Sequence, residues 1–197
     1  MKMKKLLAVV LTGVMAVSML TGCATLDARN IASDLEGMLK VVNDKATVSA
    51  TNDAKDLAAK AAKAVQDENT TWAEPASDDS EENTQVSMEE AVKAALKTEE
   101  NTKEYVWYAC YKSEDVKNVA QAQKIYNLLV DEGKINTGAA LNSAKITDKT
   151  EDEKTFKPSA DNKFELGLKT FEKKVGDKKV EYTVVIVTCK VVYTESK

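Results

Sequence analysis

Histidine is absent from all 197 residues, and arginine occurs once, as Arg29. Without histidine, the chain lacks the Ser-His-Asp and Cys-His arrangements that activate a nucleophile, and it lacks imidazole ligands for zinc or copper. A single arginine excludes a site built from paired guanidinium groups for phosphate or carboxylate. The sequence also contains no Gly-rich phosphate loop and no Cys-x-x-Cys pair. Ser-Lys and paired-carboxylate chemistry stay open, but enzymatic activity is the least favoured function, and we expect neither a metal nor a cofactor.

Positive charge is also scarce. The chain has 32 acidic and 28 basic residues, and three of the lysines lie in the first five residues, MKMKK. The remaining 25 basic residues leave residues 23–197 with a net charge of −7. Nucleic-acid binding and polybasic attachment to membranes both depend on dense positive charge, so both are disfavoured. The length favours one domain with a core of its own.

The first 22 residues have the pattern of an export signal. The basic start MKMKK is followed by an apolar run over residues 6–22, LLAVVLTGVMAVSMLTG, which contains small residues near its end. As a helix this run would be about 26 Å long, shorter than the ~30 Å apolar core of a bilayer. A cleaved signal peptide over residues 1–22 is therefore favoured over a membrane-spanning helix.

The end of this run, Leu20-Thr21-Gly22-Cys23, resembles the lipobox of bacterial lipoproteins. The resemblance covers residues 1–24 and implies cleavage between Gly22 and Cys23, with acyl chains such as palmitate attached through the Cys23 thiol. Two acyl chains hold a protein stably on a bilayer. The resemblance thus implies a lipid anchor on the outer, extracytoplasmic face of a bacterial cell membrane. An ordinary signal cleaved nearby, which leaves Cys23 as a free thiol, is the alternative.

Two helices and a linker are expected next. Apolar residues recur at helical spacing over residues 27–43, and Asp27 is a candidate N-cap. Residues 52–66 are rich in alanine, so this helix would pack closely through a narrow face or hardly pack at all. Residues 67–85 contain seven acidic residues and no basic one, a composition typical of a mobile linker. We therefore expect residues 23–66 to form a helical segment behind the lipidated cysteine, followed by an acidic linker over 67–86.

Residues 87–197 are expected to form the folded domain. Ser87 and Glu90 have the spacing of a capping box, which opens a helix over residues 88–98. EYVWYACYK, residues 104–112, has the composition of a strand, and Ser113 is placed to cap a helix that follows it.

The C-terminal residues predict a β-hairpin. Residues 163–174 and 179–195 are two strand-like runs joined by a turn over 175–178. The second run is apolar on both faces in its middle, which favours a central strand covered on both sides, with a binding site on one face as the alternative. The predicted fold class is α+β, in which N-terminal helices are joined by an acidic linker to an antiparallel sheet packed with helices.

Aromatic residues alternate along the strand over 104–112. Tyr105, Trp107 and Tyr111 would share one face, where they could stack on sugar rings or on a peptide as a ligand platform. Aromatic residues are also ordinary core and cross-strand fillers, and that alternative stays open.

Cys110 and Cys189 both lie in predicted strands. In an exported protein such a pair is a candidate disulfide if the two strands are neighbours. Two buried, reduced thiols are the alternative.

Together these features predict a membrane-anchored, extracytoplasmic lipoprotein that acts as a binding or interaction module for a peptide, a glycan or a protein partner. The alternative is a structural or accessory subunit of a cell-surface or secretion assembly. The expected partners are the bilayer, through acylated Cys23, and a ligand or protein, but no nucleic acid.

Overall fold

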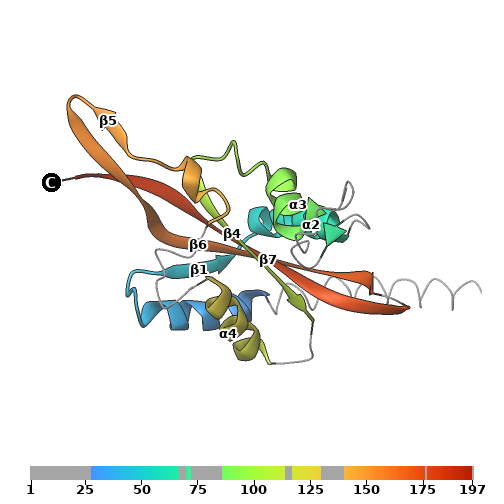
Figure 1. Ribbon diagram of the computed structural model, residues 1–197. Helices are drawn as coiled ribbons and strands as arrows, with labels where there is room; N and C mark the ends of the chain where they lie inside the picture. The colour runs from blue at the N-terminus through green and yellow to red at the C-terminus, as the bar shows by residue number, and fades with distance from the viewer. Residues whose placement is uncertain are drawn as a thin grey trace, which may run out of the picture.

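A computed structural model describes residues 28–66, 70–71, 86–113, 117–129, 140–175 and 177–196 (Figure 1). Residues 28–40 are helical. The elements that follow, in chain order, are β1 (Thr47–Ala50), α2 (Asn52–Gln66), β2 (Thr70–Thr71), β3 (Val86–Ser87), α3 (Met88–Leu96), β4 (Glu104–Lys112), α4 (Asn118–Leu129), the short 3-10 helix η2 (Ser143–Lys145), β5 (Lys149–Glu151), β6 (Lys154–Val175) and β7 (Lys178–Glu195).

The main sheet has the strand order β1-β6-β7-β4, and β5 pairs with the first residues of β6. The long β6–β7 hairpin forms its centre, and β4 pairs antiparallel with β7. β1 instead runs parallel to β6, with Val48 opposite Phe164. The predicted α+β class is therefore confirmed, but the sheet is mixed rather than antiparallel.

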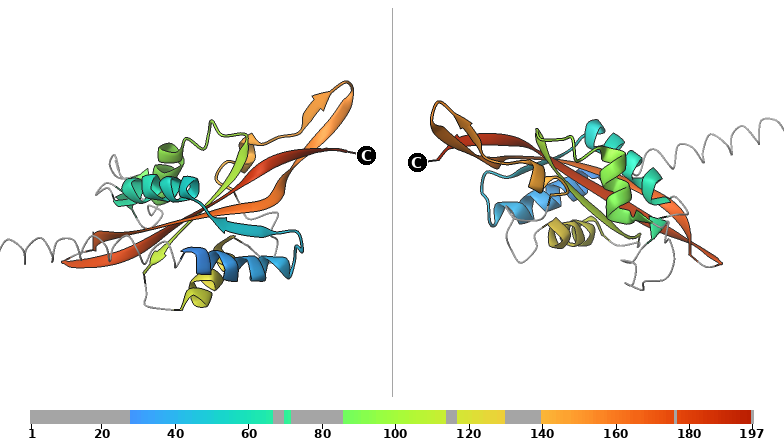
Figure 2. Two further views of the ribbon diagram at one scale, coloured as in Figure 1. Left: turned by 180° about the vertical axis from the view of Figure 1, so that it is seen from behind. Right: turned by 45° about the horizontal axis from the view of Figure 1, so that its top comes forward.

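Helices cover both faces of the sheet (Figure 2). The helix over residues 28–40 and α4 lie on one face, whereas α2 and α3 lie on the other. Alternate residues of β7 point into the two layers, with Val185 and Val187 on the first face and Val184 and Ile186 on the second. All four are at most 1% exposed. β7 is thus the central strand that its two apolar faces predicted.

The alanine face of α2 packs closely against the sheet. Ala54, Ala58, Ala61 and Ala62 are each at most 2% exposed, because small side chains let the helix axis approach the strands. Of the two alternatives for this helix, close packing is the correct one.

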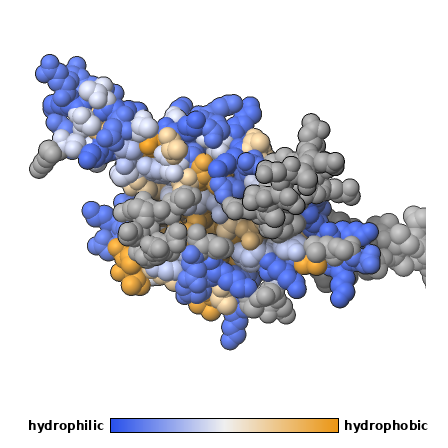
Figure 3. Space-filling model, viewed as in Figure 1, coloured by the Kyte–Doolittle hydropathy of each residue, from blue (hydrophilic) through white to orange (hydrophobic). Residues whose placement is uncertain are grey.

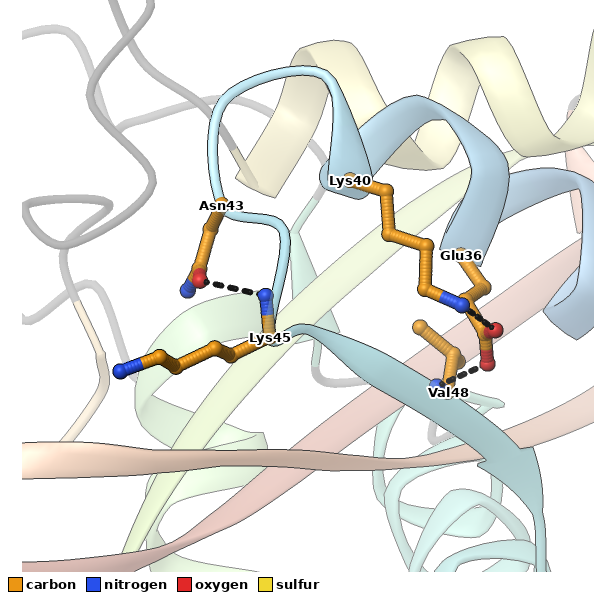
Figure 4. A network of polar contacts seen from close by, with 5 residues as sticks. All are labelled: Glu36, Lys40, Asn43, Lys45 and Val48. Atoms are coloured by element: carbon orange, nitrogen blue, oxygen red, sulfur yellow. Dashed lines mark hydrogen bonds and ion pairs between the residues drawn. The ribbon is translucent and has the colours of Figure 1, made fainter.

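A polar network joins the helix over residues 28–40 to the start of β1 (Figure 4). One carboxylate oxygen of Glu36 accepts a bond from Lys40, and the other accepts the backbone N–H of Val48 at 2.9 Å. In the connecting turn, Asn43 Oδ1 accepts the N–H of Lys45 at 3.2 Å. Glu36 thereby satisfies a backbone donor of β1 that its pairing with β6 leaves free.

The N-terminal segment belongs to the same core as residues 87–197. Ile31 and Leu35 pack into one cluster with strand residues of β4, β6 and β7. The expected acidic linker lies mostly outside the described residues. Its Thr70 and Thr71 form β2, which pairs parallel with β3. Asp27, the expected N-cap, also lies outside the described residues.

Candidate interaction site on the strand arm

One end of the sheet extends beyond both helical layers as an arm (Figures 1 and 2). We define the arm as β5, residues 154–160 of β6 and residues 191–195 of β7. β6 and β7 pair in this part from Phe156 opposite Glu195 to Ala160 opposite Val191, and β5 adds a third strand. Surface hydropathy shows that much of the arm is hydrophilic on the side seen in Figure 3.

The arm is amphipathic. The face that continues the layer of the helix over residues 28–40 carries half-buried apolar side chains, namely Phe156, Pro158, Ala160, Val191 and Tyr193, with the exposed Glu195 opposite Phe156 at its outer end. The opposite face consists of exposed side chains, namely Thr155, Lys157, Ser159, Val192 and Thr194. Tyr105 of β4 lies next to the apolar face. Burial raises its pKa, and nearby Tyr193 and Cys189 raise it further.

Polar and cationic contacts hold the arm together. Lys149 Nζ of β5 lies 4.0 Å from the centre of the Tyr193 ring, a cation–π contact between β5 and β7. Lys154 Nζ pairs with the Glu195 carboxylate at 3.1 Å. The backbone N–H of Ser196 donates to the carbonyl of Thr155 at 2.7 Å. The three strands are therefore tied to one another up to the end of β7.

The β6 edge of the arm is protected against pairing with another chain. β5 occupies this edge at Lys154–Phe156. Pro158, two residues further on, has no N–H to offer. A bulge between Ala160 and Phe164 then breaks the strand, and Asn162 within it has a φ of 69°. Prolines and bulges are common means of blocking a sheet edge.

The β7 edge of the arm differs, because β4 does not extend along it. Among the described residues, the last contact on this side is the N–H of Val191, which donates to the carbonyl of Lys103 at 2.8 Å. Before Lys103 the chain turns away, since Asn101 Oδ1 accepts the N–H groups of Lys103 and Glu104 at 3.1 Å each.

A buried asparagine fixes this turn. Asn142 is 2% exposed, and its Nδ2 donates to the carbonyls of Asn101, at 2.8 Å, and of Glu104. Its Oδ1 accepts the N–H of Val106 at 3.1 Å. The turn that leaves the β7 edge uncovered is thus firmly anchored in the core.

Alternation along β7 shows which groups this edge presents. Both backbone groups of a residue in an antiparallel strand point to the same side, and successive residues alternate. Since the N–H of Val191 points away from β6, the N–H groups of Tyr193 and Glu195 do so too. The N–H of Ser196 points toward β6. Among the described residues, no strand pairs with β7 on this side beyond Lys190. Tyr193 and Glu195 therefore present two donors and two acceptors at an open edge.

A polar cavity of about 130 Å³ lies where the arm joins the body of the domain. It is lined by Glu104, Asp161, Lys163, Glu165, Thr188, Cys189 and Lys190. The thiol of Cys189 donates to Asp161 Oδ1 at 3.1 Å. Burial raises the pKa of Cys189 to about 12, and Asp161 adds to this shift, so the thiol is a poor nucleophile at neutral pH.

The aromatic residues of β4 do not form an exposed ligand platform. Tyr105, Trp107 and Tyr111 share one face, as alternation predicted, but this face is covered. Trp107 is 7% exposed and packs 5.9 Å from the ring of Phe164, while Tyr105 and Tyr111 are half-buried against the same cluster. The core alternative for these residues is the correct one, because the helices lie over this side of the sheet.

Cys110 and Cys189 do not form the candidate disulfide, and both are free. Their strands are neighbours, as a disulfide would require, but Cys110 lies opposite Val184 and Cys189 opposite Tyr105. The two thiols are thus five positions apart along the strands and belong to the clusters on opposite faces of the sheet. No backbone adjustment short of breaking the sheet would bring them together.

The signal region stays a prediction from sequence, because Gly22 and Cys23 lie outside the described residues. In the described part of the chain, no helix is long and apolar enough to cross a membrane. Within those same residues, no group of three or more cysteine and carboxylate side chains is arranged to hold a metal ion.

Sequence analysis missed the arm. Residues 149–162 are mostly polar and include a run of charges, KTEDEK, which is typical of a loop. The sequence did contain a signal for it: Phe156, Pro158 and Ala160 alternate with polar residues, which is the pattern of a strand. The proline in this run indicates an edge strand.

Comparisons of the chain with protein-family models, curated proteins and solved structures give no match. Function is therefore inferred from the residues of the chain and their geometry.

Proposed function

We propose that the chain is a lipoprotein anchored through Cys23 on the outer face of a bacterial membrane, and that it binds another protein there through the arm. The lipobox-like residues 20–23, after a basic and apolar start, support the anchoring. The open edge of β7 at Tyr193 and Glu195 is the observation that carries the binding role. Exposed strand edges bind extended segments of partner proteins through backbone hydrogen bonds.

The chemistry of the arm favours a protein over the other ligand classes. The aromatic platform on which a glycan was expected to stack is covered, because the rings on β4 pack into the core. A nucleic acid would need dense positive charge, which the chain lacks. A strand edge beside half-buried Phe156 and Tyr193 offers both main-chain pairing and apolar contact to a peptide segment. We assign the protein a binding rather than a catalytic role.

The experiment uses the full chain in a bacterial host. Membrane fractionation of the unchanged protein and of Cys23→Ser tests the anchor, and we expect only the variant to leave the membrane fraction. A photo-crosslinking amino acid at Val192 tests the arm, with the same probe at Val119 as the matched control. Both side chains are exposed, at 38% and 50%, but Val119 lies on α4.

We expect a discrete protein adduct from position 192 and none from position 119. Glu195→Pro removes an N–H that points to the open edge and should abolish the adduct, whereas Glu195→Ala should keep it. Equal labelling from both positions, or an adduct that survives Glu195→Pro, would contradict binding at the arm.

A further inference from the structure

We propose that the open edge of β7 pairs with the same edge of a second copy of this chain, antiparallel and centred on Thr194. The proposal deepens the proposed function, on which it rests, by naming the partner segment. It follows from the directions of the backbone groups, from the charges along the edge and from the way the arm projects.

The backbone geometry sets the register. The backbone N–H and C=O groups of Tyr193 and Glu195 point outward to the open edge. Those of Thr194, which lies between them and opposite Lys157, point toward β6. In an antiparallel pair centred on Thr194, Tyr193 of each copy lies opposite Glu195 of the other. Each of these two pairs exchanges both N–H···O=C bonds, so that all four outward groups of each edge are satisfied. The free length of one edge therefore matches the free length of the other.

The side chains fit this register without repulsion. The two copies of Thr194 lie opposite each other, and Thr–Thr is a favourable cross-strand pair. Glu195 is the only acidic residue between Val191 and Ser196, and its carboxylate already pairs with Lys154 of its own copy. Glu195 of one copy lies opposite Tyr193 of the other, so no like charges face each other across the new pair. The cation–π contact of Lys149 keeps the Tyr193 ring on the apolar face, clear of the edge.

The projection of the arm makes room for the second copy. In an antiparallel arrangement the two globular bodies lie at opposite ends of the joined arms. Because the arm extends beyond the helices on both faces (Figure 2), the paired edges would meet away from the helical layers of each copy. The sheet of one copy would then continue into the sheet of the other through their β7 strands.

A short edge of this kind needs a high local concentration, and a membrane anchor provides one. Tethering on one bilayer confines both copies to a thin layer, which raises their effective concentration without any new contact. The pairing is therefore expected on the membrane and is expected to weaken strongly when the anchor is removed by Cys23→Ser.

Cysteine trapping in intact cells tests the register. In this register the Thr194 Cα atoms of two copies are about 4.5 Å apart, as in a non-hydrogen-bonded antiparallel pair. A disulfide spans about 4.4–6.8 Å between Cα atoms, so Thr194→Cys should give a covalent dimer under mild oxidation. Val192→Cys is the matched control, since its two copies would be about 14 Å apart at ~3.4 Å per residue. Both variants contain the same native cysteines, and the unchanged chain gives the background.

We expect at least tenfold more disulfide dimer from Thr194→Cys than from Val192→Cys, and loss of that dimer when Glu195→Pro is added. Equal dimer from the two cysteines, or none from Thr194→Cys, would overturn the pairing. Fractionation of the same cells separates this result from the anchoring. Protein in the membrane without the Thr194 dimer contradicts only the self-pairing. Protein outside the membrane contradicts the anchor, and a Thr194 dimer found there would still support the register.

Discussion

Gly167 in β6 lies directly against the backbone of Ala54 in α2. A Cβ atom built on Gly167 would be 1.9 Å from the Ala54 carbonyl oxygen and 2.6 Å from the backbone nitrogen of Lys55. Neither atom can move without displacing the helix. Glycine is therefore required at this position for α2 to approach the sheet as closely as its alanine face allows.

Gly167→Ala should accordingly destabilise the protein by about 3 kcal/mol or more, the upper range for inserting an atom into a packed core. Gly37→Ala is the matched control, because a Cβ on that helical residue meets nothing within 4 Å. We expect it to stabilise the protein by about 0.5–1 kcal/mol, since alanine loses less backbone entropy in a helix. Urea unfolding of both variants measures the difference, and a Gly167→Ala protein as stable as the parent would contradict the packing.

Trp107 provides the test of the aromatic face of β4. If the ring is a core side chain, Trp107→Ala should lower the free energy of unfolding by about 3–5 kcal/mol. Tyr111→Phe should instead be neutral or slightly stabilising. Its hydroxyl is buried and has no hydrogen-bond partner among the described residues, and burial raises its pKa to about 12. A Trp107→Ala protein of unchanged stability would mean that the ring is not packed as the structure has it.

Thiol alkylation tests whether Cys110 and Cys189 are free or joined in a disulfide. Burial raises the pKa of Cys110 to about 11 and that of Cys189 to about 12. Since the thiolate is the reactive form and an exposed thiol has a pKa near 8.5, alkylation of the folded protein at pH 8 should be at least ~100-fold slower than after unfolding. Peptide mass analysis should find both residues alkylated in urea without any reductant. Thiols that react in urea only after reduction would show that they are paired.

The sequence predicted the elements whose signals are local. α2 spans Asn52–Gln66, as its alanine-rich run indicated. The capping box at Ser87 is present, with both of its hydrogen bonds. β7 is buried in its middle because its residues are apolar on both faces, and no knowledge of its neighbours was needed to infer that. Periodicity and capping chemistry are properties of a few adjacent residues, so they can be read directly.

The elements that sequence analysis missed depend on distant residues. β1 has four residues and forms only because β6, more than 100 residues away, provides its parallel partner. Ser113 has the chemistry of a helix cap, but its N–H bonds to Glu181 at 2.9 Å and its hydroxyl pairs with Thr183 at 2.7 Å, so it extends the β4–β7 contact instead.

The candidate site shows the same limit. Alternation placed Tyr105, Trp107 and Tyr111 on one face correctly, but it could not show that helices cover this face. It also could not show that the pairing of β4 with β7 stops at Lys190 while β7 runs on to Glu195. This difference in length leaves the β7 edge of the arm open. Both facts depend on how elements far apart in the chain are arranged.

The polar network at Glu36 predicts how stability changes in acid. The hydrogen bond from Lys40, followed by that from the N–H of Val48, lowers the pKa of Glu36 below its ordinary value. Because the pKa is lower in the folded than in the unfolded chain, the ionised carboxylate stabilises the fold above about pH 4.5, the unfolded value. This contribution is lost as the pH falls through the folded pKa. Glu36→Gln should therefore cost stability at pH 7 and little at pH 3.

We expect this difference to be below about 1 kcal/mol, because the ion pair lies at the surface and solvent screens it. Urea unfolding of the parent and of Glu36→Gln at both pH values measures it. Glu89→Gln is the matched control: Glu89 forms a similar i,i+4 pair with Lys93. Glu36 also accepts a hydrogen bond from the N–H of Val48. The stability change caused by Glu36→Gln should therefore depend more strongly on pH. An equal effect of the two substitutions would mean that the bond to Val48 adds nothing to the stability of β1.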